Sequence, residues 1–282
     1  MKKTLNIAGK LLDLSTPQVM GILNITPDSF FSGSRVLQVE DAYKKAEKML
    51  SEGASMLDLG GHSTRPGADA VSVEEELKRV LPVVEMIRKR FPEAIISIDT
   101  FRSSVARQAV EAGAYIINDI AGGNLDPLMF ETVAQLNVPY ILMHSRGTPQ
   151  TMKELNQYDD LVTDVLRELQ SKIYQLRQLG VKDIVADMGF GFAKNADQNY
   201  ILLRELQAFK ALDVPLLIGV SRKSMIWRKL NISPEQSLNG TTVLNTVALL
   251  NGASILRVHD VKEAVEAVKL VQLVKPDFIS HS

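Results

Sequence analysis

Short apolar runs recur along the chain, and nearly all of them end in a polar residue capable of chemistry. The eight runs are Val19–Leu23, Met56–Leu59, Ile95–Ile98, Tyr115–Ile117, Tyr140–Met143, Ile184–Ala186, Leu216–Ile218 and Ile255–Leu256. At or just past their ends stand Asn24, Asp58, Asp99, Asn118 with Asp119, His144, Asp187, Arg222 with Lys223, and Arg257 with His259. Continuous short apolar runs are typical of strands buried in a parallel sheet. The pattern predicts an α/β fold, a (β/α)8 TIM barrel with its active site at the C-terminal ends of the strands.

Glycine marks the passage from predicted helices into several of these runs. Gly53, Gly113, Gly180 and Gly252 each stand a few residues before an apolar run. A glycine after a helix adopts the left-handed conformation at little cost and lets the chain turn. A repeated helix–glycine–strand junction is what stacked βα units require, and it supports the barrel.

Amphipathic helices are predicted between the runs. Three of them lie at Asp41–Leu50, Asp159–Leu179 and Asp260–Val274. Another begins at Ser72, because Ser72 and Glu75 have the spacing of a capping box ahead of apolar residues at helical intervals. Pro82 lies within that helix and is expected to distort it.

Length and composition fit one soluble barrel. The chain has 282 residues, of which 45% are hydrophobic and 23% charged, and its formal net charge is −1. A barrel takes roughly 250 residues, and no linker or low-complexity segment interrupts the chain, so residues 1–282 are predicted to form a single domain. A net charge near zero provides no basic field to attract nucleic acid. The absence of cysteine excludes disulfides and thiolate metal sites.

The N-terminal segment does not read as a signal peptide. Lys10 and Asp13 interrupt the apolar stretch of Met1–Pro17, and no small-residue cleavage site follows. No run approaches the roughly 20 apolar residues of a membrane span. We therefore expect a cytoplasmic protein with no membrane partner.

Two long polar loops follow the first two runs. They are Thr26–Arg35 and Gly60–Val71, both rich in Gly, Ser, Thr and Pro. Long loops on the catalytic face of a barrel usually carry function. The alternative is that they are solvated connectors.

The polar residues at the strand ends offer distinct kinds of chemistry. Asp99, Asn118 and Asp187 could hydrogen-bond the edge of a flat heterocycle. Asn24 offers a hard oxygen ligand suited to Mg²⁺ that also binds substrate phosphates.

Cationic groups on the same face could hold an anion such as a phosphate ester. They are Arg65, Lys223, Arg257 and His259. Glycines nearby leave room for a ligand to approach the backbone. They are Gly189, Gly191 and Gly219.

Each of these assignments has a structural alternative. Asp99 and Asp187 could cap the helices that follow them. Arg257 and His259 could form a surface pair, and Asn24 could be a turn residue. These alternatives weaken together, because eight separate strand ends would have to be polar by accident.

Seven segments resemble those of one enzyme family. They are MGILNITPDSF (20–30), DLGGHSTRPGA (58–68), SIDT (97–100), INDI (117–120), DMGFGFAKN (187–195), IGVSRKSMI (218–226) and RVHDVKE (257–263). They resemble dihydropteroate synthase, occur in that family's order and cover nearly the whole chain. The resemblance implies condensation of 6-hydroxymethyl-7,8-dihydropterin diphosphate with 4-aminobenzoate (para-aminobenzoate). The products are 7,8-dihydropteroate and diphosphate, on the pathway to folate.

The resemblance also implies roles for single residues in binding the first substrate. Asn24 is similar to the family's Mg²⁺ ligand. The pterin-binding set corresponds to Asp99, Asn118, Asp187 and Lys223, with Met143 packing nearby and Gly219 among the substrate-binding positions. Arg257 and His259 resemble the pair that binds the diphosphate. The catalytic roles implied are those of Asp99, Lys223, Arg257 and His259.

The aminobenzoate pocket of the family maps to two parts of the chain. Thr64, Arg65 and Pro66 resemble the second loop, which helps to close the pocket. The remaining positions of the pocket correspond to Phe30, Phe192, Lys223 and Ser224.

The implied chemistry suits these residue types. Diphosphate leaves readily once its charge is neutralised, and Mg²⁺ with Arg257 can stabilise the charge that develops on its oxygens. Its departure would leave a cationic methylene, stabilised by the pterin ring and by carboxylates such as Asp99. The aromatic amine then attacks. No covalent nucleophile is needed, so positioning and electrostatics are the main contributions of the protein.

The chain departs from the family pattern at a few positions. Met188 stands where the family usually has proline, Ala193 where it has glycine, and His62 where it has glutamate. In the first loop Ser32 replaces an acidic residue, and Phe31 is an additional aromatic. We expect altered loop ordering and altered sulfonamide sensitivity, which inhibition constants of the natural chain and a Ser32→Asp variant would test.

Two other readings compete with the synthase. A corrinoid-dependent methyltransferase barrel would share the Asp and Asn contacts to pterin, but it would not need the Ser-Thr-Arg-Pro loop or the cationic clusters. A pterin-binding protein without activity is the other, and the retained charged residues at the strand ends argue against it. The family resemblance implies a homodimer, with a contact surface among the C-terminal helices.

Overall fold

The structure is a computed structural model. It describes residues 3–25, 35–62, 71–148, 150–152 and 154–274.

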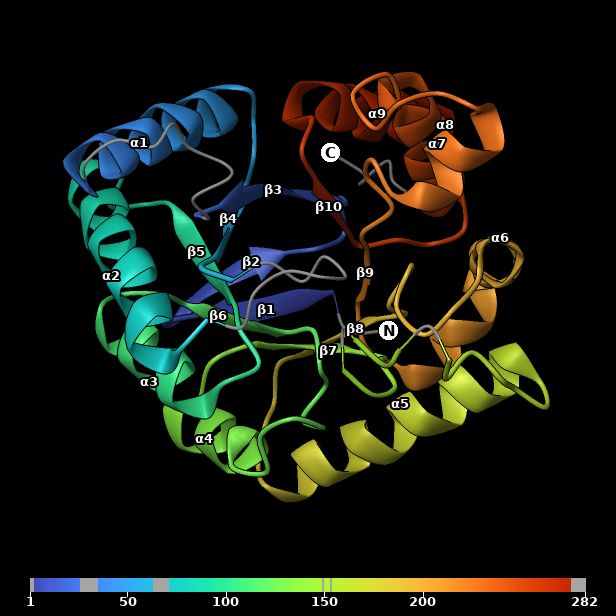
Figure 1. Ribbon diagram of the computed structural model, residues 1–282, viewed down its shortest axis with the longest axis horizontal. Coiled ribbons are helices and arrows are strands. Elements are labelled where there is room, and N and C mark those ends of the chain that lie inside the picture. The colour runs from blue at the N-terminus through green and yellow to red at the C-terminus, as the bar shows by residue number, and fades with distance from the viewer. Residues whose placement is uncertain (1–2, 26–34, 63–70, 149, 153, 275–282) are drawn as a thin grey trace.

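Eight parallel strands close into a barrel, which confirms the predicted fold class (Figure 1). They are β3 (Gln18–Asn24), β4 (Met56–Gly60), β5 (Ile95–Asp99), β6 (Ile116–Asp119), β7 (Tyr140–Met143), β8 (Ile184–Asp187), β9 (Leu216–Ile218) and β10 (Ile255–Val258). Each strand pairs with the next along the chain, and β10 pairs with both β9 and β3 to close the ring. Each predicted run overlaps one strand. Most strands extend further into the polar positions, because the backbone ladder continues there whatever the side chain.

Helices connect the strands and surround the barrel (Figure 1). They are α1 (Arg35–Ser51), α2 (Val73–Arg90), α3 (Ser103–Glu111), α4 (Met129–Leu136), α5 (Leu161–Gln178), α6 (Ala196–Arg204), the 3₁₀ helix η2 (Leu206–Leu212), α7 (Ser224–Leu230), α8 (Leu238–Leu250) and α9 (Val261–Val274). Ser72 caps α2 as predicted, since its side chain accepts a hydrogen bond from the backbone N–H of Glu75 at 3.2 Å. The helix continues through Pro82. Within the described ranges, no helix combines the length and the apolar character that a membrane span needs.

The predicted glycine junctions are present. Gly53, Gly113, Gly180 and Gly252 have φ of 99°, 114°, 89° and 102°. These values lie in the region where a side chain is disfavoured. The residue type is therefore set by the turn that leads into each strand.

A hairpin that the apolar pattern did not predict covers the amino ends of the strands. It consists of β1 (Thr4–Ile7) and β2 (Lys10–Asp13), joined by a turn with positive φ at Ala8 and Gly9. Leu5, Ile7 and Leu14 are buried against apolar side chains from the barrel strands. The hairpin thereby closes the barrel at this end.

Because side chains alternate between the two faces of each strand, the polar residues form the layer next to the apolar side chains that pack on the hairpin. The inward side chains packed on the hairpin are Met20, Met56, Ile116, Ile141, Val185, Leu217 and Ile255. Residues two apart on a strand share a face. The next inward positions are therefore Ile22, Asp58, Asn118, Met143, Asp187, Gly219 and Arg257. The fold brings residues that are distant in sequence together in one layer at the open end of the barrel.

Candidate active site

Neighbouring strands place four of the strand-end residues side by side. Asn24 is paired in register with Gly60, Gly60 with Asp99, and Asp99 with Asn118. A Cβ on Gly60 would lie 3.7 Å from Oδ2 of Asp99 and 3.8 Å from Oδ1 of Asn24. Because Gly60 has no side chain, these two oxygens face the same small space.

Arg257 joins two carboxylates in this layer. Its Nε donates to Oδ2 of Asp58 at 2.6 Å, and its Nη2 donates to Oδ2 of Asp99 at 2.7 Å. Both carboxylates are buried. Arginine suits this position because its planar guanidinium can bind both at once and still has further N–H donors.

Asp58 also fixes two other side chains. Its Oδ1 accepts from the hydroxyl of Ser97 at 2.6 Å, and its Oδ2 accepts from Nδ2 of Asn118 at 2.9 Å. Asp58 is fully buried. A buried carboxylate is stable only when its oxygens are bonded, and here those bonds set the orientation of the Asn118 amide and of Arg257.

Asp99 is the carboxylate with spare bonding capacity. Its Oδ1 is buried and has no hydrogen-bond partner among the described residues. Burial raises its pKa to about 7, against the opposing charge of Arg257, and the nearby Asp58 raises it further. One guanidinium shared between two carboxylates does not fully compensate both. A ligand with N–H donors would stabilise the ionised form.

This raised pKa predicts a pH-dependent stability. Between about pH 4 and about pH 7 the folded Asp99 keeps a proton that the unfolded carboxyl has released, so its contribution to the free energy of unfolding falls as pH rises. The contribution is complete below about pH 4 and lost above about pH 7. An Asp99→Asn variant has no carboxyl at this position and therefore lacks this pH-dependent contribution to the free energy of unfolding. Urea unfolding gives the free energy of unfolding of both proteins. The value for the variant minus that for the natural chain should rise by at least about 1 kcal/mol from about pH 4 to about pH 7. A difference that does not change with pH would contradict the assignment.

The segment after β8 carries a second part of the site. Oδ1 of Asp187 accepts from the backbone N–H of Gly189 at 2.7 Å. Nζ of Lys223 donates to the carbonyl oxygen of Phe190 and lies 4.9 Å from the centre of the Phe192 ring. Burial raises the pKa of Asp187, opposed by the nearby Lys223. Burial also lowers the pKa of Lys223 to about 8.

The cationic residues after β9 and β10 have different environments. His259 is exposed, and its Nδ1 lies 3.0 Å from the hydroxyl of Ser221. Arg222 binds both oxygens of Asp260, at 2.9 and 2.7 Å, and has a positive φ of 54°. Arg222 is therefore held by Asp260, whereas its neighbour Lys223 bonds to the segment after β8.

Several sequence alternatives are now decided. The alternative that Asp99 and Asp187 cap helices is wrong, because the N-cap positions of α3 and α6 are Arg102 and Asn195. The surface-pair alternative is wrong for Arg257, which bonds to buried carboxylates.

The remaining predicted residues fall into two groups. Met143 is buried beside Gly189, Gly219 lies beside Arg257, and Ser224 is exposed at the start of α7. Thr64, Arg65 and Pro66 lie outside the described residues, as do Phe30, Phe31 and Ser32. Their roles stay predictions.

The three remaining departures lie close to the site. Met188 is completely buried in the core outside the barrel. His62 packs edge-on against Phe101, and burial together with Arg102 and Arg79 lowers its pKa to about 4. Ala193 is buried with a positive φ of 49°.

The conformation of Ala193 predicts a stabilising substitution. The left-handed conformation costs an alanine roughly 1–2 kcal/mol more than a glycine. Glycine also makes the unfolded state more flexible, which cancels part of that difference in the free energy of unfolding. Ala193→Gly should therefore raise the free energy of unfolding by about 0.5–1 kcal/mol in urea titrations. Ala186→Gly, in β8, is the matched control and should lower it. Destabilisation by both changes would contradict the expected relief of strain.

Sequence reasoning gave no role to Asp58, Ser97, Ser221 or Lys194. Asp58 was visible as the one charged residue inside an apolar run, two positions after the inward Met56. That spacing was the available signal for a buried functional carboxylate.

Comparison with known proteins agrees with this geometry. The family model described as "Pterin binding enzyme" matches residues 20–259. The dihydropteroate synthase of Escherichia coli (strain K12) is 48% identical over 266 residues, which cover 94% of this chain and 94% of that protein. A Yersinia pestis dihydropteroate synthase structure with a sulfonamide drug complex has a TM-score of 0.90 and 44% identity, covering 96% of this chain and 98% of that one. The Xanthomonas albilineans enzyme with 4-aminobenzoic acid has a TM-score of 0.90 and 41% identity, covering 98% and 99%.

The family model of the pterin-binding enzymes reaches all eight strands of the closed barrel, including the strand ends that carry the buried acids, the amide and the arginine. The chain belongs to that family. Within it, the chain belongs with the dihydropteroate synthases, which are transferases of folate biosynthesis.

Proposed function

We propose that the dihydropteroate synthase reaction takes place in the open end of this barrel, with residues of the inward layer in specific roles. The enzyme condenses 6-hydroxymethyl-7,8-dihydropterin diphosphate with 4-aminobenzoate to give 7,8-dihydropteroate and diphosphate. The observation that carries the residue assignment is the cluster in which Arg257 binds both Asp58 and Asp99.

The pterin is bound by the acids and the amide. Oδ1 of Asp99, buried and without a partner among the described residues, is placed to accept from a ring N–H. Asn118 and Asp187 offer further hydrogen-bonding groups from β6 and β8, both within the inward layer. Lys223 lies across the site, where its ammonium can bind a ring acceptor. Such edge contacts orient a flat heterocycle.

Arg257 and His259 bind the diphosphate. Two nitrogens of Arg257 are held by carboxylates, which fixes the plane of the guanidinium while other N–H groups face the ligand. His259 follows two residues later at the rim of the barrel. A fixed cation stabilises the charge that develops on the leaving oxygens without needing to reorganise.

Asn24 fits the Mg²⁺ that accompanies the diphosphate. Its side-chain oxygen and Oδ2 of Asp99 face the same space beside Gly60. The described residues include no group of three His, Asp or Glu side chains around a common point. A sparse oxygen set of this kind suits Mg²⁺, which keeps several waters and binds substrate phosphates. When bound, Mg²⁺ would neutralise phosphate charge.

The chain promotes the reaction by positioning and electrostatics. Arg257 and His259 hold the diphosphate as the bond to the methylene breaks. Asp99 supplies negative charge near the cationic pterin methylene that remains. The amine of 4-aminobenzoate then attacks the methylene and loses one N–H proton to solvent, and Phe192, Lys223 and Ser224 line its approach in the proposed arrangement. Thr64, Arg65 and Pro66 are proposed to complete that pocket.

The first experiment measures diphosphate release from purified protein with dihydropterin diphosphate, 4-aminobenzoate and Mg²⁺, and identifies the product by mass. Release that depends on aminobenzoate and yields dihydropteroate supports the proposal. Tight pterin binding without turnover would instead favour the inactive binding protein. Methyl transfer from a methylated pterin to a corrinoid would favour the methyltransferase.

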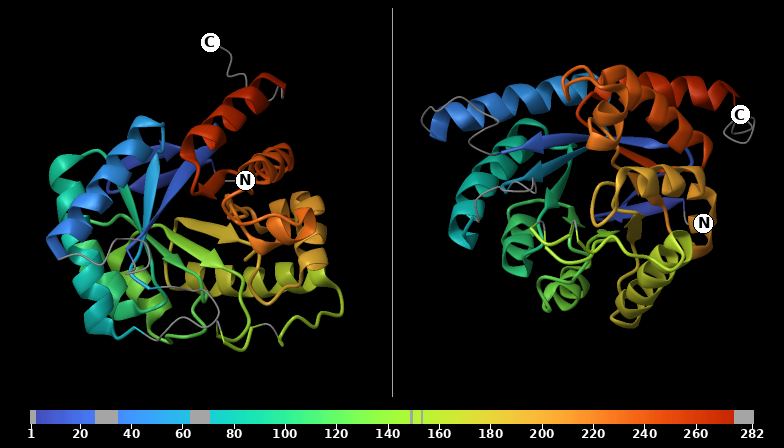
Figure 2. Two further views of the ribbon diagram at one scale, coloured as in Figure 1. Left: turned by 45° about the horizontal axis from the view of Figure 1, so that its top comes forward. Right: turned by 45° about the vertical axis from the view of Figure 1, so that its right-hand side comes forward.

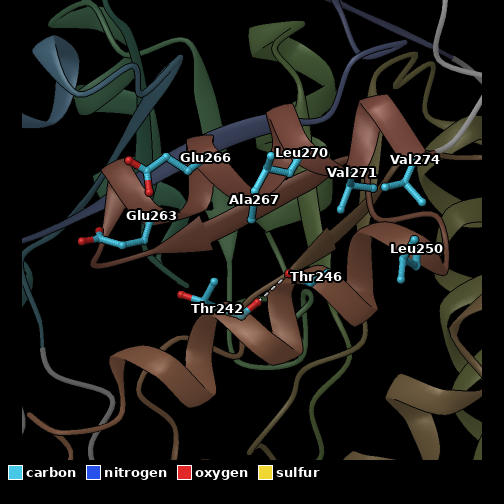
Figure 3. A pocket seen from close by; sticks show the side chains of 9 residues that line it. All are labelled: Thr242, Thr246, Leu250, Glu263, Glu266, Ala267, Leu270, Val271 and Val274. Carbon is cyan, nitrogen blue, oxygen red and sulfur yellow. Dashed lines mark hydrogen bonds between the residues drawn. The ribbon is translucent and has the colours of Figure 1, made fainter.

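We also propose a homodimer formed through α8 and α9. These helices pack side by side at one edge of the molecule (Figure 2). A groove of about 310 Å³ lies between them, with Thr242 and Thr246 on one side and Ala267, Leu270 and Val271 on the other (Figure 3). Leu270, Leu273 and Val274 are 64%, 80% and 72% exposed. An exposed apolar patch of this kind marks a protein contact, and a second copy is the occupant that the family resemblance implies.

The dimer predicts a specific effect of charge on α9. Leu270→Glu should convert the natural chain from twice the mass of one chain to a monomer in light scattering after gel filtration, because a buried charge would lack a partner. Tyr174→Glu, on α5 and equally exposed at 64%, is the matched control and should stay dimeric. A natural chain that is already monomeric would contradict the proposal.

The whole chain is proposed to form one domain in the cytoplasm. The single closed barrel and the cysteine-free composition support this assignment.

A further inference from the structure

A buried lysine lies behind the candidate site, and the proposed mechanism gives it no role. Lys194 belongs to the segment between β8 and α6, and it is 8% exposed. Its Nζ lies 2.9 Å from Nδ1 of His144, 3.0 Å from the carbonyl oxygen of Phe192 and 3.2 Å from that of Gly189. Three acceptors around one nitrogen match the three donors of an ammonium ion. The lysine is thus fully bonded within the protein and does not itself face a ligand.

The contacts of Lys194 lead outward through a chain of polar groups. If Nδ1 of His144 accepts from the lysine, the ring proton lies on Nε2, which is 3.0 Å from Oε2 of Glu168, close enough for an electrostatic contact but without the geometry of a hydrogen bond. Glu168 in turn accepts from Nε of Arg146 at 3.0 Å. The ring of Tyr158 lies 4.0 Å below the Arg146 guanidinium, and its hydroxyl donates to the carbonyl oxygen of Ala193. The lysine is therefore fixed from β7 and α5 as well as from its own segment.

The segment that Lys194 holds has an unusual backbone. Gly189, Gly191 and Ala193 have positive φ of 66°, 80° and 49°. A backbone of this kind forms few regular hydrogen bonds and costs free energy, so it needs side-chain bonds to keep one conformation. Lys194 provides two such bonds, to the carbonyl oxygens of Gly189 and Phe192.

The same segment makes the contacts that orient the pterin-binding groups. The N–H of Gly189 bonds to Asp187, the carbonyl oxygen of Phe190 accepts from Lys223, and the Phe192 ring lies near the Lys223 ammonium. Each of these groups lies within a few residues of an atom that Lys194 binds. A displacement of the segment would therefore move the partners of both Asp187 and Lys223.

We propose that Lys194 is a positioning residue for the synthase reaction: anchored by His144 and Glu168, its ammonium fixes residues 189–192 so that Asp187 and Lys223 are held ready for the pterin. This inference rests on the proposed function, in which those two residues bind pterin. Burial lowers the pKa of Lys194 to about 7, against the opposing negative charge of Asp187. The charge of Asp187 therefore offsets part of the cost of burying the ammonium.

The test compares Lys194→Met with Lys172→Met. Lys172 on α5 likewise donates to a loop carbonyl, that of Gly122 at 2.7 Å, and to Oδ1 of Asn124 at 2.8 Å. It serves the segment after β6 and makes no contact with residues 189–192. The readouts are thermal unfolding, the Kd of dihydropterin diphosphate measured by pterin fluorescence, and kcat/KM for the same substrate.

Both substitutions are expected to lower thermal stability. Only Lys194→Met should weaken pterin binding and lower kcat/KM, each by about tenfold, as loss of a buried charged donor implies. Glu168→Gln, one step further along the chain of contacts, should show the same change to a smaller extent, about threefold, and keeps the test valid if Lys194→Met does not fold.

Equal pterin affinity and kcat/KM in Lys194→Met and Lys172→Met would overturn the inference. If Lys194→Met does not fold, an unchanged Glu168→Gln would do so. A natural chain that forms no dihydropteroate is a separate outcome, which overturns the proposed function and with it this inference.

Discussion

Arg257→Lys should lower kcat/KM by about 100-fold or more, because removing a preorganised donor to a developing oxyanion has effects of this size. A lysine keeps the charge but offers a single donating atom at a different depth. It cannot span Oδ2 of Asp58 and Oδ2 of Asp99, which Arg257 reaches with separate nitrogens at 2.6 and 2.7 Å. A guanidinium held on two sides has one orientation, whereas an ammonium on a flexible stem does not. The loss should appear in both kcat and the affinity for inorganic diphosphate.

The matched control is Arg88→Lys at the opposite end of the barrel. Arg88 donates to the carbonyl oxygen of Pro92 at 2.6 Å and lies 4.8 Å over the ring of Tyr115. The same chemical change there should affect stability only. Steady-state kinetics and calorimetric titration with diphosphate distinguish the two variants. Comparable activity in both would show that Arg257 does not bind the leaving group.

Asp58→Asn should lower both stability and activity. The carboxylate accepts from Ser97, Asn118 and Arg257. An asparagine would turn an N–H group toward one of these donors and leave the half-buried Arg257 with a single carboxylate. Breaking a buried ion pair from one side costs about 3–5 kcal/mol. The free energy of unfolding should fall by about this amount, and kcat/KM of the folded fraction should fall by about 100-fold.

Asp119→Asn separates the two effects. Asp119 is also fully buried, and it accepts from the N–H groups of Ala121 and Gly123 and from the hydroxyl of Tyr140. It follows the inward Asn118 and therefore points away from the barrel interior. This variant should lose a comparable amount of stability while its folded fraction keeps its activity. Denaturant titration and active-fraction kinetics test both variants, and equal kinetic losses would remove Asp58 from the site.

Much of this site could be predicted because strand geometry is regular. Asn118, Asp187 and Arg257 lie at inward positions, two residues after apolar side chains that pack on the hairpin. Alternation alone therefore brings together residues from β6, β8 and β10. The strand boundaries were predicted closely for the same reason, since buried parallel strands have few sequence patterns other than a continuous apolar run.

The parts that could not be predicted depend on local backbone conformation or on distant partners. Arg222 and Lys223 are equivalent by position after β9, and only their contacts separate them: Arg222 has a positive φ and bonds to Asp260, whereas Lys223 bonds to Phe190. In the hairpin, Leu5 and Ile7 alternate with Thr4 and Asn6, but each of its two strands has four residues, and β2 has no buried side chain. So short a pattern does not identify a strand by itself. Lys194 received no role from the sequence, because its burial depends on contacts such as that with His144, fifty residues earlier.

The hairpin that covers the amino ends of the strands has a kinetic consequence. With Leu5, Ile7 and Leu14 filling that end, the described residues leave the barrel open at the carboxyl ends of the strands. In the proposed arrangement the pterin lies against the buried Asn118 and Asp187, beneath the exposed Ser224. An aminobenzoate that arrived first would occupy the end of the barrel that the described residues leave open. We therefore expect a compulsory order in which the pterin diphosphate binds first, and initial-rate plots should show aminobenzoate analogues inhibiting uncompetitively against it.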